Sequence, residues 1–250
     1  MFAEERHSLI KKIVRENQRM NFAELQGKVK VSPATLRRDL AGLEQSGDLI
    51  RVHGGVLHPS YARSEISFDE RLHRNNAAKK AIALKTASLI PPGSSVFVDA
   101  GSTCLEAGKI LLRRKDIRLI THSVALLAEA LHGEASVLCV GGELRQVSGA
   151  LTGGNTLGSL ASIQSEFALL GASGLNEEGL WTTELSEAEI KQAIISRTRR
   201  VLLLADSTKW GTASTVRFAP WEKVTDWVTE GKLARRAKDG VRSGLRIHMG

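Results

Sequence analysis

Apolar residues recur at helical spacing in three short segments of the first 57 residues, and an alternating segment follows them. In the first segment they form one stripe, made of Leu9, Ile10, Ile13 and Val14. The second segment begins at Asn21, whose side chain can cap a helix together with Glu24 three residues on. The third runs from Ser32 to Gly47. This spacing predicts three short helices.

The third segment has the features of a helix that reads DNA. Ser32 can accept a hydrogen bond from a first-turn amide, and Pro33 needs no amide partner at the first helical position. The inward positions are all leucine: Leu36, Leu40 and Leu43. The opposite face is small and basic, with Arg38 on it and Thr35 and Arg37 on its flanks. A recognition helix needs this shape, because it must enter the major groove and present its first turns to the bases.

A basic β-hairpin is predicted directly after this helix. Ile50 and Val52 alternate with Arg51 and His53, and Gly54-Gly55 supplies a tight turn. Joined to three helices, such a hairpin is the wing of a winged helix-turn-helix, and its basic side chains can reach the DNA backbone or the minor groove. The alternative is a small helical domain whose basic face is merely solvated. The complete order of capped helices and basic hairpin favours the DNA reader.

Helical segments and short apolar segments alternate from Lys79 onward. The predicted strands cover residues 95–101, 117–123, 136–142, 167–174 and 200–206, and the predicted helices cover residues 79–90, 102–114, 123–132, 156–165 and 186–198. Alternation of this kind is typical of a mostly parallel sheet with helices on both faces. We therefore expect an α/β fold for this part of the chain.

Three regions follow from these patterns. Residues 1–57 are predicted to form a winged helix-turn-helix DNA-binding domain, and residues 79–250 an α/β domain that binds an effector. Residues 58–78 are polar and mixed in charge, which indicates a linker that becomes the lead-in to the second domain. The last residues, 245–250, are predicted to form a final edge strand.

Small, hydroxyl-bearing or charged residues follow the predicted strands. Because the carboxyl ends of parallel strands meet at one edge of the sheet, where α/β proteins bind ligands, these residues are candidates for a binding site. They occupy positions 99–103 (DAGST), 121–123 (THS), 141–143 (GGE), 171–174 (GASG) and 206–209 (DSTK). Gly101 permits close approach of a ligand, and the hydroxyls of Ser102 and Thr103 open a helix whose N-terminus suits a phosphate. Lys209 can supply the matching positive charge.

Composition and charge narrow the classes of protein. With 42% hydrophobic and 25% charged residues, the chain has the composition of a soluble globular protein, and it lacks an apolar run or leader long enough to cross a membrane. We expect a cytoplasmic location. The net charge of +8 comprises +3 in residues 1–57 and +5 in residues 231–250, so charge alone does not identify a DNA reader. Cys104 and Cys139 are expected to be buried thiols, without a disulfide or metal site.

Residues 6–57, and especially VSPATLRRDLAGLEQSGDLIRVHGG, closely resemble the N-terminal domain of the DeoR/GlpR family of bacterial regulators of sugar metabolism. By that resemblance Ser32 and Thr35 contact DNA phosphates, and Arg37 and Arg38 divide between bases and backbone. Arg51 and His53 lie on the wing. The complete predicted DNA-binding set is Asn21, Ser32, Pro33, Thr35, Arg37, Arg38, Arg51 and His53.

Residues 68–230 look like the C-terminal effector domain of the same family, which is similar in fold to ribose-5-phosphate isomerase and typically binds phosphorylated sugars. Its landmarks here are R-x-x-x-N-x-x-x-K (Arg71, Asn75, Lys79), D-x-G-[ST]-T, G-G-E-x-R and D-x-[ST]-K. The resemblance implies that the phosphate is held by Asp99, Gly101, Ser102 and Thr103 with Lys209. It also implies that the sugar side is lined by Ser123, Gly141, Gly142 and Asp206.

Two features of this domain stay open. Glu187 and Lys191, one helical turn apart, form either a surface ion pair, which we favour slightly, or a pair inside the pocket. His122 stands where the family usually has Asn, and it either alters the effector or faces solvent. The tail after Glu230 is also unusually basic for the family.

These observations predict a DNA-binding transcription regulator that represses a carbohydrate-metabolism operon. A phosphorylated sugar either releases this repressor from its operator or adjusts its binding to the operator. Operator DNA and the sugar phosphate are the expected partners, and a dimer or tetramer is the expected assembly. No cofactor, metal or membrane is expected, and the chain is not expected to be an enzyme.

Two other functions compete with that of a regulator. A sugar-phosphate isomerase would use carboxylates such as Asp99 or Asp206, but it leaves the first 57 residues without a purpose. A DNA binder without an effector is disfavoured by the polar strand ends.

Overall fold

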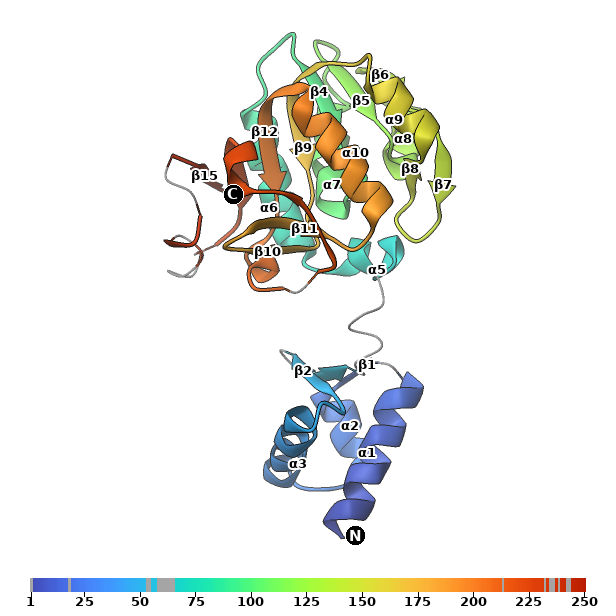
Figure 1. Cartoon of the computed structure of the whole chain (residues 1–250), viewed down its shortest axis with the longest axis vertical. Helices are drawn as coiled ribbons and strands as arrows, with labels where there is room; N and C mark the ends of the chain where they lie inside the picture. Colours follow the sequence, from blue (N-terminus) through green and yellow to red (C-terminus); the bar gives the residue numbers. More distant parts are fainter. Residues whose placement is uncertain are drawn as a thin grey trace. The chain divides into compact units, whose positions relative to one another are not determined.

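The chain consists of two compact units, Met1–Ile66 and Ser67–Gly250, which are described separately (Figure 1). The boundary falls inside the predicted linker and lead-in, 58–78. The computed structural model describes residues 2–17, 19–52, 55–57, 66–212, 214–231, 233, 237, 239–241 and 244–250.

The first unit packs three helices against a small antiparallel sheet. Its elements are α1 (Ala3–Asn17), β1 (Arg19–Asn21), α2 (Phe22–Val29), α3 (Pro33–Gln45), β2 (Ile50–Val52) and β3 (Gly55–Leu57). The predicted stripes form its core, which consists of Ile10, Ile13, Val14, Met20, Leu25, Val29, Leu36, Leu40, Leu43, Leu49 and Val56. The three predicted helices and the hairpin are therefore confirmed.

A third strand, which the sequence pattern did not predict, completes this sheet. The strand order is β1-β3-β2, and both pairs are antiparallel. β1 has only three residues, too few to show an alternating pattern. A Cβ atom at Gly55 would lie 2.2 Å from the carbonyl oxygen of Met20 in β1. The close approach of β1 therefore requires glycine at position 55, which lies in β3 and pairs with Val52; residues 53 and 54, between β2 and β3, lie outside the described residues.

A parallel sheet of seven strands forms the centre of the second unit, and this confirms the predicted α/β fold. Its order is β15-β14-β12-β9-β4-β5-β6, and every described pair in it is parallel. The strands are β4 (Ser95–Val98), β5 (Arg118–Thr121), β6 (Ser136–Cys139), β9 (Ser165–Leu170), β12 (Thr198–Leu204), β14 (Asp226–Thr229) and β15 (Arg246–Met249). β15 is the edge strand predicted for the C-terminal residues.

Helices cover both faces of this sheet (Figure 1). They are α5 (Phe68–His73), α6 (Asn76–Ser88), α7 (Ser102–Leu111), α8 (Val124–Ala130), α9 (Gly154–Leu160) and α10 (Leu185–Ser196). The helices α6, α7 and α8 share one core with Val96 and Val98 of β4. The helices α9 and α10 share the other core with Phe97. Consecutive residues of β4 thus point to opposite faces, as a strand buried on both sides requires.

Two small antiparallel sheets lie outside the main one. One has the order β10-β11-β13 and consists of β10 (Gly174–Asn176), β11 (Gly179–Thr182) and β13 (Val216–Ala219). The other pairs β7 (Glu143–Arg145) with β8 (Ala150–Thr152). Neither was predicted, because strands of three or four residues are too short to show a hydrophobic pattern.

The second unit also begins before Lys79, where the regular alternation starts. Helix α5 and the start of α6 lie in the segment expected to be a lead-in. Phe68 is buried in the core that α6 and α7 share, and its N–H donates to the carbonyl of Val147 (2.8 Å). One buried aromatic residue therefore attaches α5 to the domain, a signal too local to read as a helical stripe.

The two cysteines differ in burial. Cys104 on α7 is buried, as expected, whereas Cys139 on β6 is exposed, so the expectation of a buried thiol there was wrong. β6 is an edge strand of the main sheet, and an edge strand has a neighbour on one side only. Both cysteines are free.

Candidate functional site

Helix α3 presents the predicted DNA-reading face to solvent. Its N-cap, Ser32, accepts a hydrogen bond from the N–H of Thr35 (3.2 Å), and the two hydroxyls lie 2.8 Å apart. Pro33 occupies the first helical turn. The side chains of Ser32, Pro33, Arg37 and Arg38 are exposed, and Thr35 is half-buried. The predicted cap is confirmed, and the basic face is free to meet a ligand.

The two arginines of α3 differ in how they are held. The guanidinium of Arg37 lies over the ring of Phe22 on α2, 5.3 Å from its centroid, which restricts its direction. Within the described part of the chain, the side chain of Arg38 has no hydrogen-bond or ion-pair partner. Arg38 therefore offers all its donors to an external acceptor.

A buried ion pair fixes α3 against α1. Asp39, on α3, accepts from Nε (2.5 Å) and Nη2 (2.9 Å) of Arg6, and Nε2 of His7 lies 3.2 Å away. The hydrogen bond from Arg6 outweighs the effect of burial and holds the pKa of Asp39 below its ordinary value. Sequence reasoning missed this pair, because Arg6 and Asp39 lie 33 positions apart.

The wing is tied to the end of α3. The Nη1 atom of Arg51 lies 3.6 Å from Oε2 of Glu44, and the backbone N–H of Arg51 donates to Oε1 (3.4 Å). Arg51 is exposed, as a DNA contact requires. His53, the other predicted wing residue, lies outside the described residues. Asn21 is exposed and caps α2 by accepting the N–H of Glu24 (2.8 Å), as predicted.

In the second unit, the chain changes face between β4 and β9. After β4 it enters α7 on one face of the sheet, and after β9 it passes through β10 and β11 to α10 on the other face. The carboxyl ends of β4 and β9 are neighbours, and the N–H of Asp99 donates to the carbonyl of Leu169 (3.0 Å). Such a point opens a crevice at the carboxyl edge, which is where doubly wound sheets bind ligands.

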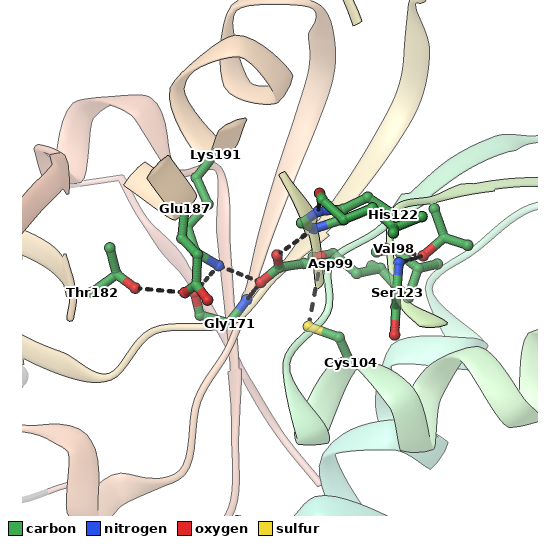
Figure 2. Close-up of polar contacts among 12 residues, drawn as sticks. Val98, Asp99, Cys104, His122, Ser123, Gly171, Thr182, Glu187 and Lys191 are labelled. Atoms are coloured by element: carbon green, nitrogen blue, oxygen red, sulfur yellow. Dashed lines mark hydrogen bonds and ion pairs between the residues drawn. The ribbon is translucent and has the colours of Figure 1, made fainter. Parts of the chain in front are cut away.

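A buried group of charges lies at this point (Figure 2). Asp99 lies between Lys191 and His122: its Oδ2 accepts from Nζ of Lys191 and from the N–H of Gly171 (3.0 Å), and its Oδ1 lies 3.2 Å from Nε2 of His122. Nδ1 of His122 lies 2.9 Å from the carbonyl oxygen of Leu151. Burial alone would raise the pKa of Asp99, but Lys191 and His122 outweigh it and hold that pKa well below its ordinary value.

One open alternative is excluded here, and one expectation is corrected. His122 is 2% exposed, so it does not face solvent. Glu187 and Lys191 are both buried, so the surface ion pair that the sequence favoured was wrong. Glu187 instead meets Nη1 of Arg145 (3.2 Å), from β7, and the hydroxyl of Thr182 (3.2 Å). The i,i+4 spacing predicted a shared face correctly, but α10 turns that face toward the carboxyl edge of the sheet.

The start of α7 keeps its donors free for a ligand. Gly101 is the N-cap of this ten-residue helix and makes no side-chain cap, so the first-turn amides are not covered by one. The hydroxyls of Ser102, which is buried, and Thr103, which is half-buried, have no hydrogen-bond partner among the described residues. The amides and the positive end of the helix dipole attract an anion.

The predicted D-x-[ST]-K residues form a turn after β12. Asp206 is buried and accepts from the N–H (3.1 Å) and the hydroxyl of Thr208. The N–H and hydroxyl of Ser207 are taken by Glu230. Lys209 is half-buried. Burial and the charges of Arg71 and Arg74 lower the pKa of Lys209, and they outweigh the opposite effect of Asp206. Asp206 thus orders the turn that carries Lys209.

The remaining predicted residues, Ser123, Gly141 and Gly142, hold neighbouring elements together. Ser123 is buried and caps α8 by accepting the N–H of Leu126 (3.3 Å). Gly141 accepts the hydroxyl of Thr156 (2.8 Å), and a Cβ at Gly142 would lie 1.9 Å from that hydroxyl oxygen. These residues join the ends of β5 and β6 to neighbouring elements. Among the described residues, no hydrogen bond joins Ser123, Gly141 or Gly142 to Asp99.

The comparisons with known proteins agree with the division of the chain into two units. Residues 6–61 match the DeoR-like helix-turn-helix domain, and residues 74–231 match the DeoR C terminal sensor domain. Within the described residues, no helix is both long and apolar enough to span a bilayer, and no group of three or more His, Cys, Asp or Glu could hold a metal ion.

Relatives that match most of the chain carry the names of transcription regulators. The chain is 34% identical over 220 residues to the uncharacterized HTH-type transcriptional regulator FruR of Bacillus subtilis, covering 88% of each chain. It is 32% identical over 209 residues to the glycerol-3-phosphate regulon repressor of Escherichia coli, covering 83% of this chain and 82% of that one. A solved ribose 5-phosphate isomerase A from Methanocaldococcus jannaschii is similar over 55% of this chain and 56% of its own, with 16% identity and a TM-score of 0.41. The chain belongs to the DeoR family of helix-turn-helix transcriptional regulators.

Proposed function

We propose that the second unit of this DNA-binding regulator binds a small phosphorylated sugar or polyol, and that binding lowers the affinity of the first unit for operator DNA. The observation that carries the proposal is the switch point at the carboxyl ends of β4 and β9, where free donors at the start of α7 adjoin the buried charges of Asp99 and Lys191. The name of the E. coli relative, a glycerol-3-phosphate regulon repressor, supports the same class of ligand.

The phosphate is assigned to the amides of Gly101, Ser102 and Thr103, to the hydroxyls of the last two, and to Lys209. Amides at a helix N-terminus and an ammonium group are the donors that phosphate prefers. Asp99 is assigned differently from the expectation, because an ionised carboxylate repels phosphate and its oxygens already face Lys191, His122 and Gly171. Its role in this proposal is to hold Lys191 in place.

The sugar side is assigned to the ends of β5, β6 and β12. Lys191, with its ammonium at the crevice, and the backbone at Gly141 and Gly142 are suited to meet hydroxyl groups, which both donate and accept hydrogen bonds. Ser123 and Asp206 support this side by capping the elements that form it.

We further propose that the regulator acts in the cytoplasm as a symmetric oligomer. One α3 helix reaches one half-site in the major groove, and regulators of this kind bind two half-sites related by a two-fold axis. The expected form is a dimer or tetramer, with α3 supplying Arg37 and Arg38 to each half-site.

The experiment is a titration of labelled DNA from upstream of the neighbouring genes at two salt concentrations, followed by addition of phosphorylated sugars. The expected result is one fragment bound more tightly than random DNA, and its release by a phosphorylated compound but not by the dephosphorylated form. Binding no stronger than to random DNA on every fragment would contradict operator recognition. Specific binding that no phosphorylated compound alters would contradict the effector assignment.

A further inference from the structure

Helix α5 carries two arginines whose guanidinium groups have unsatisfied donors. The Nε and Nη2 atoms of Arg71 and the Nε atom of Arg74 are buried, and they have no hydrogen-bond partner among the described residues. Arg74 uses Nη2 to pair with Glu70 (2.5 Å). The Arg71 guanidinium lies over the ring of Phe68, 5.7 Å from its centroid. A buried guanidinium donor without an acceptor costs free energy, so the two arginines favour the binding of an anion.

Lys79 and Lys209 add positive charge near the two arginines of α5. Lys79, at the start of α6, is 4% exposed and donates from Nζ to the carbonyls of Arg71 and of Leu72 (3.3 Å), at the end of α5. Burial is the main cause that lowers the pKa of Lys79, and the charges of Lys209 and Arg71 lower it further. Each of the two lysines therefore lies within electrostatic reach of Arg71.

The carboxylates around this cluster are already engaged. Asp206 accepts from Thr208 and, at 3.4 Å, from Nδ2 of Asn75, which also lies 3.4 Å from the Thr208 hydroxyl. Glu106 on α7 pairs with Lys109 (3.1 Å). Asn75, in the left-handed conformation between α5 and α6 (φ 51°), thus joins the lead-in to the turn that carries Lys209.

We propose that Arg71 and Arg74 bind the phosphate group of the effector together with Lys209, and that α5 passes the signal to the linker. The inference rests on the proposed function and adds two ligands to it. A planar guanidinium with two free N–H donors matches the geometry of a phosphate, which takes paired hydrogen bonds. A phosphorylated compound supplies the acceptor oxygens that the described residues do not.

The position of α5 in the chain gives this contact a regulatory consequence. α5 is the first helix of the second unit and follows the boundary at Ile66–Ser67 directly. A phosphate held by α5 and by the turn after β12 fixes the end of the linker to the sheet. The effector thereby acts on the segment that leads to the DNA reader.

DNA phosphate is the competing ligand for a basic cluster, and burial disfavours it. The atoms Nε and Nη2 of Arg71 are buried, whereas the arginines suited to a duplex, such as Arg38, are exposed. A small phosphorylated molecule is better suited than a rigid duplex to reach donors that the fold buries.

The test compares Arg71→Ala, Arg71→Lys and Arg74→Ala with Arg113→Ala in the full chain. Arg113 is exposed after α7, and its side chain makes no hydrogen bond or ion pair with a described residue, so it controls for the loss of one charge. The probes are inorganic phosphate, glycerol 3-phosphate, ribose 5-phosphate and fructose 1-phosphate, each sugar or polyol also in its dephosphorylated form. Calorimetry and thermal shift measure binding, and labelled operator DNA measures release.

The expected result is a loss of about 10- to 100-fold in affinity for the bound phosphorylated compound in Arg71→Ala, since a charge-assisted hydrogen bond is removed. A smaller loss is expected for Arg71→Lys, which keeps the charge but not the fork. Arg113→Ala should stay within about twofold of the unaltered chain. At saturating compound, Arg71→Ala should also release less DNA.

Three results would overturn the proposal. If the unaltered chain binds the compound and both Arg71→Ala and Arg74→Ala bind it with unchanged affinity, the proposed phosphate contact is contradicted, but the proposed function is not. Weaker DNA binding by Arg71→Ala without any effector, with a shallower salt dependence, makes Arg71 a DNA contact. An unaltered chain that binds none of the probes contradicts the proposed function itself. If Arg71→Ala does not fold, Arg71→Lys and Arg74→Ala decide the question.

Discussion

The ammonium of Lys191 donates a hydrogen bond to the carboxylate of Asp99, although the two residues lie 92 positions apart in the sequence. Lys191 comes from the middle of α10, on one face of the sheet, and Asp99 directly follows β4 at the point where the chain leaves for α7 on the other face. The pair therefore joins both layers at the crevice. Lys191 also lies 5.3 Å from the centroid of the Phe218 ring, which helps to fix its direction.

Replacing Lys191 by Met should destabilise the second unit by about 3 kcal/mol, because it leaves the buried Asp99 carboxylate without its main counter-charge. All four tryptophans lie in this unit, so their fluorescence reports its unfolding in urea separately from the first unit. Lys80→Met, at an exposed position of α6, is the matched control and should change stability little. The double variant Asp99→Asn/Lys191→Met should recover part of the loss; equal stability of Lys191→Met and the control would refute the buried pair.

Stability of the second unit should fall below about pH 4. The folded-state pKa of Asp99 lies below its ordinary value, so its ion pair contributes fully above the unfolded pKa and is lost as the pH falls toward the folded one. In Asp99→Asn the free energy of unfolding should therefore depend less on pH between 5 and 3, with a slope smaller by up to about 1.4 kcal/mol per pH unit. Urea unfolding followed at several pH values measures both slopes, and identical slopes would argue against an ionised Asp99.

Substitutions of Ser32 should separate its capping role from its predicted contact with a DNA phosphate. Ser32→Ala removes the cap of α3 and should cost about 1 kcal/mol of stability in the first unit. Ser32→Asp keeps a capping oxygen and should restore that stability, but its charge should repel the phosphate and weaken DNA binding. Circular dichroism on melting and DNA titration provide the two readouts. Normal DNA affinity in Ser32→Asp would place the phosphate elsewhere.

Arg38 should be among the DNA contacts with the largest effect, since its donors have no partner among the described residues. If it reads a base, Arg38→Ala should cost about 1–3 kcal/mol on the operator and relax preference at one position. If it binds phosphate, affinity should fall on all sequences and the salt slope by about one. Lys12→Ala, exposed on α1, is the control. An effect no larger than that of the control would remove Arg38 from the interface.

Local patterns predicted most of the fold. The leucine stripe of α3 and its cap at Ser32 are determined within one helix, and both are confirmed. The inner strands β4, β5, β9 and β12 of the main sheet are apolar because both faces are buried, and this made them predictable too. The strand β14 was not predicted, because its four residues, Asp226–Thr229, follow no helical segment that the pattern revealed. By contrast, β1 is visible only through its pairing with β3, which the sequence around residues 19–21 does not encode locally.

The site was predicted less completely, because its charges pair across the fold. The ends of β4 and β12 drew attention to Asp99 and Lys209, but the partners of Asp99 come from β5 and α10. The E-x-x-x-K spacing of Glu187 and Lys191 is the same for an exposed and an inward face. The packing of α10 decides whether this face is exposed or buried, so the spacing alone led to the wrong prediction of a surface pair.

The affinity of the full chain for operator DNA, measured with and without a phosphorylated sugar, tests the account most directly. A bound compound should weaken DNA binding by about tenfold or more, which corresponds to a coupling free energy of about 1.4 kcal/mol, and the dephosphorylated form should have no effect. Calorimetry on the same sample establishes that the compound is bound. A compound that binds the second unit and leaves operator affinity unchanged would contradict the account.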